Sequence, residues 1–213
     1  MVILKIPNMK IMTSQSSQKS SKREERRQKR QRQQRTSQFW WGSGIVLGIG
    51  LLSFLLWYAN RPLLGEKVPV SGENDHVTEN NPLPPYSTNP PTSGTHYPTW
   101  WEAGFYDETS PQATGVAFPA GYLVHNLEHG YVIFWYNCTL ITPEECVTLK
   151  SDLRAVLDQA NNFKVIAFPW TTTDVPVVAT SWGQLLKMDT FDAKLAAEMI
   201  RRNRNHAPEP NAQ

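Results

Sequence analysis

The chain has 213 residues, enough for one domain with a hydrophobic core together with additional segments. Its formal net charge of +2 conceals two regions of opposite sign: residues 1–38 hold eleven Lys and Arg against two Glu, whereas residues 61–213 hold ten Lys and Arg against seventeen Asp and Glu. Because the larger region is acidic, it cannot extend a phosphate-binding surface from the basic segment, which argues against nucleic acid as a partner.

The N-terminal segment, residues 1–38, is dominated by Ser, Gln, Lys and Arg, and almost no apolar residue follows Met12. A segment of this composition buries too little apolar surface to offset the entropy lost on ordering, so we predict a disordered tail. An excess of Lys and Arg beside a membrane span is typical of the cytoplasmic side, and we therefore expect this basic tail in the cytoplasm.

The next segment, residues 39–60, has the sequence FWWGSGIVLGIGLLSFLLWYAN and carries no charge. About 20 apolar residues in a helix span the hydrocarbon core of a bilayer, and Trp and Tyr at both ends are typical of the headgroup level. A cleaved signal peptide is the alternative, but the basic and apolar runs are too long and no A-x-A site follows. We predict a single transmembrane helix that acts as a signal anchor in the lipid bilayer of the cell membrane. Residues 61–213 would then lie outside the cytoplasm.

Gly44 and Gly48 form a G-x-x-x-G pattern within the predicted span. Small residues at this spacing let two helices approach closely in a membrane, although glycine is common in such helices for other reasons. A homodimer through this helix face is therefore a further prediction.

The segment that follows, residues 61–93, contains seven prolines, too many for a helix or a central strand. We expect an extended connector here, followed by a folded extracytoplasmic domain over residues 94–209. Within that domain residues 131–136, YVIFWY, are aromatic or β-branched on both faces, which suits a central strand.

A helix is predicted directly after this strand. Thr142 can serve as its N-cap, Pro143 favours its first turn, and Glu145 follows the cap by three residues, which together form a capping box. Further strands are expected at residues 164–168 and 175–180, and a last helix from about Thr190. These elements predict an α+β fold: a small mixed sheet with two or more packed helices, preceded by the single transmembrane helix.

The two cysteines, Cys138 and Cys146, lie eight positions apart, between the predicted central strand and the start of the capped helix. An oxidising compartment favours their pairing, and no C-x-x-C motif is present that would indicate redox chemistry. We predict a structural disulfide; a pair of soft metal ligands is the alternative.

Four of the five histidines are candidate metal ligands. His125 and His129 are four positions apart, so they share one side of either a helix or a strand. His96 lies in PPTSGTHYPTWW, where glycine and proline favour a rigid turn, and His76 lies in the polar segment before it. Three or four neutral imidazoles suit zinc or copper. The alternative is that these are ordinary histidines that support the fold through hydrogen bonds.

The segment from His125 to His129 also fits the H-x-x-E-H pattern of a zinc-dependent hydrolase, in which Glu128 would be the catalytic general base. That motif requires a helix that continues past the second histidine, whereas Gly130 and a strand sequence follow here. It also requires a carboxylate ligand further along the chain, for which Glu198 is a candidate. A small hydrolase is therefore the third hypothesis for function.

The second hypothesis is an interaction module without metal, which would bind a cell-envelope component. Its surface would be an aromatic cluster near His96, since exposed aromatic side chains are typical of binding sites. The residues of this cluster are Tyr97, Trp100, Trp101, Phe105 and Tyr106. Packing of these rings into the core is the simpler alternative.

Four motifs stand out: PPTSGTH at 90–96, GFY at 104–106, LVHNLEHGYV at 123–132 and SWG at 181–183. Together they resemble a bacterial domain-of-unknown-function family, number 3105. The resemblance covers about residues 66–209 and implies a membrane-anchored or exported domain, without implying any reaction. It directs attention to His76, His96, His125, Glu128 and His129. The leading hypothesis is therefore an extracytoplasmic metal-binding domain with His96, His125 and His129 as ligands, His76 as a fourth, and Glu128 as ligand, supporting acceptor or base.

Overall fold

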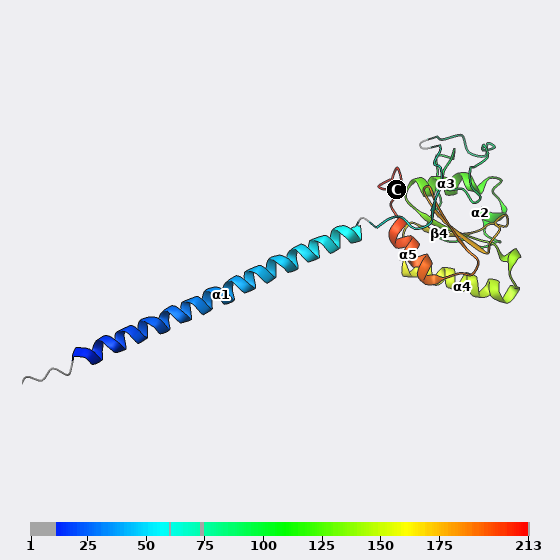
Figure 1. The fold of residues 1–213 in the computed structure, drawn as a ribbon. Coiled ribbons are helices and arrows are strands. Elements are labelled where there is room, and N and C mark those ends of the chain that lie inside the picture. The colour runs from blue at the N-terminus through cyan, green and yellow to red at the C-terminus, as the bar shows by residue number, and fades with distance from the viewer. Residues whose placement is uncertain (1–11, 60, 73–74, 213) are drawn as a thin grey trace, which may run out of the picture. The chain divides into compact units, whose positions relative to one another are not determined.

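The structure is a computed structural model that describes the backbone of residues 12–59, 61–72 and 75–212. The chain divides into two units, with a boundary between Arg61 and Pro62, and each unit is described by itself. The first unit is the helix α1, Met12–Ala59 (Figure 1).

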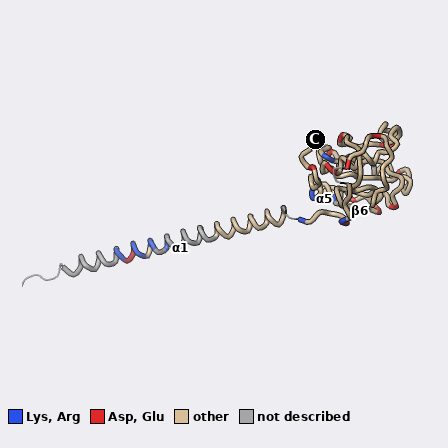
Figure 2. Tube along the Cα trace, turned by 90° about the horizontal axis from the view of Figure 1, so that it is seen from above, with Lys and Arg blue, Asp and Glu red and all other residues tan. Residues whose placement is uncertain are grey.

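Helix α1 begins well inside the segment for which composition predicts disorder. Residues 12–41 contain no Gly or Pro and are rich in Gln, Lys, Arg and Glu, which have high helix propensities. This local preference explains why the structure has helix there; residues 1–11 of the predicted tail lie outside the described residues. Figure 2 shows the described Lys and Arg residues of α1 gathered in one stretch, and no charged residue occurs between residues 39 and 59.

For the residues whose side chains are described, no helix combines the length and the apolar character that crossing a bilayer requires. The transmembrane helix predicted for residues 39–60 therefore gains no support from the structure. Part of that segment, residues 39–42 and 59–60, lies outside the described side chains. A Cβ added at Gly44 or Gly48 would meet open space, and the dimer contact through them stays a prediction.

The second unit is built on a six-stranded mixed sheet with the order β1-β6-β5-β3-β4-β2. The parallel pairs are β3 with β4 and β4 with β2, and the remaining neighbours are antiparallel. The strands are β1 Glu66–Lys67, β2 Gly104–Phe105, β3 Val132–Tyr136, β4 Val165–Pro169, β5 Val177–Ser181 and β6 Gln184–Met188. The predicted α+β class with a small mixed sheet is confirmed.

Strand β3 lies in the middle of the sheet and is buried on both faces, as its sequence predicts. Val132, Phe134 and Tyr136 join one apolar cluster, while Ile133 and Trp135 join a second cluster on the opposite face. This alternation follows from the two-residue period of a strand. The indole N–H of Trp135 donates to a threonine hydroxyl of β5, so the polar atom of this buried ring is satisfied.

Helices cover both faces of the sheet (Figure 1). On one face α4, Pro143–Gln159, and α5, Ala193–Asn203, contribute apolar side chains to the first cluster. On the other face α3, Pro119–Glu128, contributes Leu123, Val124 and Leu127 to the second. Two short helices complete the domain, α2 at Pro111–Thr114 and η1 at Cys138–Leu140.

Local signals at α4 are confirmed in detail. Thr142 caps the helix, Pro143 occupies its first turn, and Glu145 completes the capping box. Helix α5 begins at Ala193 rather than near Thr190 because the carboxylate of Asp192 caps it by accepting from two backbone N–H groups.

The predicted disulfide is also confirmed. Cys138 and Cys146 are bonded, with their Cα atoms 5.3 Å apart. The bond joins η1 to the first turns of α4 and so ties the connection after β3 to the helix that follows it.

The Pro-rich segment before the domain has mostly irregular backbone, in line with its composition, but it belongs to the second unit. The amide of Asn203 in α5 hydrogen-bonds both backbone groups of Leu64, and Val68 N–H donates to the Gly183 carbonyl. Thr92 and Ser93 are buried. The segment therefore packs on the sheet and brings His76 to the domain.

Candidate metal centre

Helix α3 positions two of the candidate side chains. Its apolar residues hold it against the sheet, and Pro119 fixes its first turn. Residues three apart on a helix are neighbours, so His125 and Glu128 extend to the same side. The helix ends at Glu128, and Gly130, with φ +84°, turns the chain toward β3; a Cβ at Gly130 would come within 2.7 Å of Asn205 Cα.

The third and fourth candidates come from two irregular segments that lie side by side. His76 and His96 form an isolated parallel bridge, in which Val77 N–H donates to the His96 carbonyl and His96 N–H donates to the Asp75 carbonyl. The turn that carries His96 is fixed to α3, because Tyr97 N–H donates to the Gly121 carbonyl. A contact between segments 20 residues apart thus sets both rings beside the helix.

These segments bring together four potential ligands: His76, His96, His125 and Glu128. One donor atom from each lies within 4.8 Å of every other. The imidazole rings pack at centroid distances of 4.6 Å for His76 and His96, 5.1 Å for His76 and His125, and 5.2 Å for His96 and His125. Three of the four residues are buried and His76 is exposed.

Backbone carbonyls orient two of the rings. His125 Nδ1 lies 2.7 Å from the Tyr97 carbonyl, and His96 Nδ1 lies 2.7 Å from the Gly94 carbonyl. A carbonyl only accepts, so both Nδ1 atoms carry the proton and donate it. In both residues Nε2 is thereby the nitrogen that faces the cluster, which is the arrangement that supports metal-ligating histidines elsewhere.

Burial also keeps the His125 ring neutral. Desolvation, with smaller contributions from neighbouring His129 and His96, lowers the pKa of His125 to about 4. With its proton on Nδ1, neutral His125 has a lone pair on Nε2 at pH 7, which is the form that binds a metal ion.

Glu128 is the charged centre of the cluster. Its side chain is fully buried, and Oε2 lies 2.9 Å from His96 Nε2 and 3.7 Å from His76 Nε2. Because His96 Nδ1 already donates to a carbonyl, the short contact between Nε2 and Oε2 needs either a second proton or a cation shared by the two atoms.

His129, a ligand in the predicted set, does not belong to this group of four, and its role as a ligand stays a prediction. It follows the last residue of α3, and its N–H still donates to the His125 carbonyl at 3.1 Å. Its Nε2 lies 3.6 Å from Glu209 Oε2, and its buried Nδ1 has no hydrogen-bond partner within the described residues. Burial lowers the pKa of His129. Its ring packs 4.3 Å from that of His125, so it borders the site.

Most of the five aromatic residues predicted to form a binding surface pack into the domain. Tyr97 is fully buried, and Trp101, Phe105 and Tyr106 pack against the two apolar clusters. Trp100 alone among the five is strongly exposed, at 41%. Its ring stacks on His125 at 5.7 Å with an interplanar angle of 12°, so it covers the histidine cluster.

Of the H-x-x-E-H pattern, His125 and Glu128 belong to the group of four and His129 does not. The catalytic role of Glu128 stays a prediction. Glu198 lies on α5, which covers the other face of the sheet, and it pairs there with Arg201 and Arg202.

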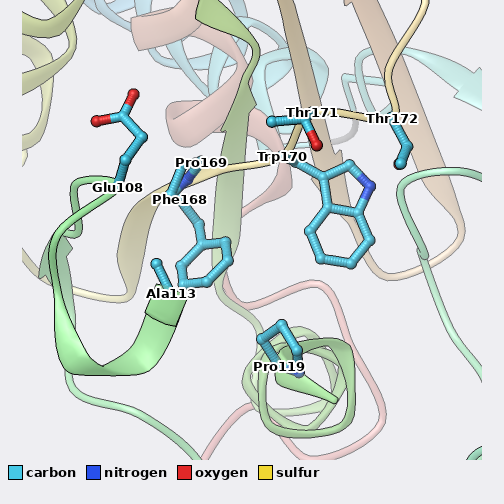
Figure 3. Close-up of a pocket in the computed structure, with 8 residues that line it drawn as sticks. All are labelled: Glu108, Ala113, Pro119, Phe168, Pro169, Trp170, Thr171 and Thr172. Carbon is cyan, nitrogen blue, oxygen red and sulfur yellow. The ribbon is translucent and has the colours of Figure 1, made fainter. Parts of the chain in front are cut away.

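Among the cavities outside the cluster, one of about 330 Å³ lies near the end of β4. Figure 3 shows the rings of Phe168, Trp170 and Pro119 around this space, with Glu108 at its edge. The indole N–H of Trp170 donates to Asn89 Oδ1 at 2.7 Å, which fixes the ring. Glu108 also groups with the two cysteines, but their disulfide removes them as ligands.

The fold and the cluster define an α+β domain with a histidine and glutamate centre able to hold a metal ion. The family model described as "Protein of unknown function (DUF3105)" matches residues 76–213, well over half of the chain. The chain therefore belongs to this family, as its motifs suggested, and the match includes all four residues of the cluster. No curated protein and no solved structure gives a significant match.

Proposed function

We propose that the domain binds one metal ion, zinc or copper, through His76, His96, His125 and Glu128. The observation that supports this most strongly is the convergence of four donor atoms within 4.8 Å, three of them on buried residues. Imidazole nitrogen and carboxylate oxygen are both common ligands of zinc in proteins.

The donor set fits the chemistry of the ion. Zinc binds histidine nitrogen and carboxylate oxygen at about 2.0–2.2 Å, which puts the donors of a tetrahedral site about 3.3 Å apart. The present separations of up to 4.8 Å require only a modest contraction around the ion. Imidazole also suits copper. The carbonyls bonded to Nδ1 of His96 and His125 would hold both rings in ligating orientation.

Four protein donors favour binding over hydrolysis. A catalytic zinc site keeps one position for water, whereas four protein ligands close a tetrahedral site. As a ligand, Glu128 would not be available as a general base. The hydrolase hypothesis would return if the metal-loaded chain hydrolysed peptides or esters and Glu128→Gln abolished this activity without loss of metal.

Metal content of the purified full-length chain tests the proposal. Elemental mass spectrometry is expected to find about one zinc or copper per chain, and none in a His96→Ala/His125→Ala variant that remains folded by circular dichroism. His206→Ala is the matched control, because His206 is the fifth histidine and is exposed outside the cluster. A wild-type chain without metal after incubation with both ions would refute the proposal.

The location of the domain remains a proposal from the sequence. We propose that residues 39–60 anchor the chain in the cell membrane and that residues 61–213 face outward. The absence of charge from this segment and the disulfide, which is typical of oxidising compartments, support it. Protease added to intact spheroplasts would digest the domain; protection of the domain until lysis would contradict this orientation.

The alternative function, an interaction module for a cell-envelope component, would now use a different site. The cavity beside Trp170 has a fixed aromatic wall, which the predicted cluster lacks. A wild-type chain that takes up neither zinc nor copper would favour this alternative.

A further inference from the structure

We infer that the metal is an exchangeable cargo, loaded and released on the side of His76, and does not hold the fold together. This inference rests on the proposed function and concerns how the same site is used. Its basis is the unequal burial and support of the four ligands, together with a core that forms without them.

The core does not depend on the site. Two apolar clusters lie on opposite faces of the sheet, and none of the four ligands belongs to either. The disulfide adds a covalent tie on the α4 side. Domains that need a metal to fold are typically small and have little core of their own, whereas this unit spans Pro62–Gln213. The domain is therefore expected to stay folded when the ion leaves.

The four ligands differ in burial. The side chains of His96 and Glu128 are 0% exposed, whereas that of His76 is 36% exposed. His125 is buried beneath Trp100. Solvent therefore reaches the cluster at His76.

The ligands also differ in support. His96 and His125 are each oriented by a carbonyl hydrogen bond at 2.7 Å. The His76 ring makes no hydrogen bond within the described part of the chain and meets Glu128 Oε2 only at 3.7 Å, beyond hydrogen-bond distance. Its backbone is held by one isolated bridge, while His125 and Glu128 belong to a buried helix. His76 is the ligand that moves at least cost.

This asymmetry gives a route for exchange. If His76 swings outward, His96, His125 and Glu128 still hold the ion, and the vacated position opens to solvent, where an acceptor can attack. Asp75 lies beside His76 at this opening, and its carboxylate accepts from Thr95 Oγ1 at 2.5 Å. A negative group at the rim raises the local concentration of cations.

Transfer of zinc to the chromogenic chelator 4-(2-pyridylazo)resorcinol tests the inference. The zinc-loaded full-length wild type is expected to release its ion completely while circular dichroism and the melting transition still show a folded domain. His76→Ala is expected to bind one zinc and to release it at least roughly tenfold faster. His96→Ala, which loses a buried and oriented ligand, is expected to retain no zinc through purification, and His206→Ala is expected to behave as wild type.

Two results would overturn this inference and leave the proposed metal binding intact. One is a wild type that yields zinc only when denaturant unfolds the domain, or a His76→Ala variant that fails to bind zinc, as His96→Ala does; this would mean a structural ion held equally by four ligands. The other is a His76→Ala variant that releases zinc no faster than the wild type, which would mean that His76 does not control release. A wild type that binds no metal at all would instead refute the proposed function, so the two failures are distinguishable.

Discussion

The two faces of the sheet are covered by different kinds of helix. On one face α4 and α5 are amphipathic: apolar residues such as Leu153 and Met199 meet the sheet, and charged residues meet the solvent. On the other face α3 is buried along nearly its whole length, including His125 and Glu128.

Burying polar side chains costs free energy unless they find partners. The buried His125 and Glu128 of α3 are therefore not there to stabilise the fold. The α4 and α5 face supplies the stable core, and the α3 face carries the chemistry. If this division is correct, substitutions on the first face change stability without changing metal binding, and substitutions on the second do the reverse.

The largest expected effect on stability comes from Leu153→Ala. Leu153 is fully buried under the sheet, and removal of its side chain leaves a cavity. We expect a loss of about 2–5 kcal/mol in the free energy of unfolding, measured by urea denaturation. The folded fraction should still bind one metal ion. Loss of metal from folded protein would contradict the claim that the two faces have separate roles in stability and metal binding.

The largest expected effect on binding comes from Glu128→Gln. This isosteric change removes the charge that the three imidazoles surround, and we expect affinity for zinc to fall by roughly 10–100-fold or more. Competition with a chelator of known affinity measures the change. Glu198→Gln, on α5, is the matched control and should leave affinity unchanged; equal losses in both variants would contradict a site on the α3 face.

Acid should weaken the metal-free domain through His125. Because burial lowers its folded-state pKa to about 4, below the ordinary value of 6.5, the unfolded chain binds a proton that the folded chain excludes between these values. Stability is therefore expected to fall as pH decreases from 6.5 to 4. Urea denaturation across this range should show a shallower fall for His125→Gln; parallel curves for the two proteins would contradict a buried neutral His125.

The smallest expected effect comes from Thr142→Ala. The Thr142 hydroxyl accepts from Glu145 N–H at the start of α4, and loss of such a cap costs about 1 kcal/mol. Thermal unfolding should shift slightly while metal affinity stays the same. A change in affinity would show that the two faces are coupled through the sheet.

Local patterns predicted the α4 side of the molecule well. The capping box of α4, the two-faced strand β3 and the disulfide depend on neighbours in sequence, and each is present. Helix α3 was less predictable because the four-residue spacing of His125 and His129 puts them on one side of either a helix or a strand, so both remained open for this segment.

The site was predictable in part. Histidine content and the family motifs singled out all four residues of the cluster, but not the pairing of His76 with His96, since an isolated bridge between irregular segments leaves no periodic signal. The sequence also did not decide between Glu128 and His129. The structure places Glu128 in the group of four and leaves His129 outside it, although the rings of His125 and His129 lie 4.3 Å apart.

The most direct test of the central claim is a crystal structure of the zinc-loaded chain with anomalous data collected on both sides of the zinc absorption edge. The account predicts one anomalous peak within about 2.0–2.2 Å of donor atoms from His76, His96, His125 and Glu128. A peak at His129 and Glu209, or no peak within the cluster despite zinc in the crystal, would contradict it.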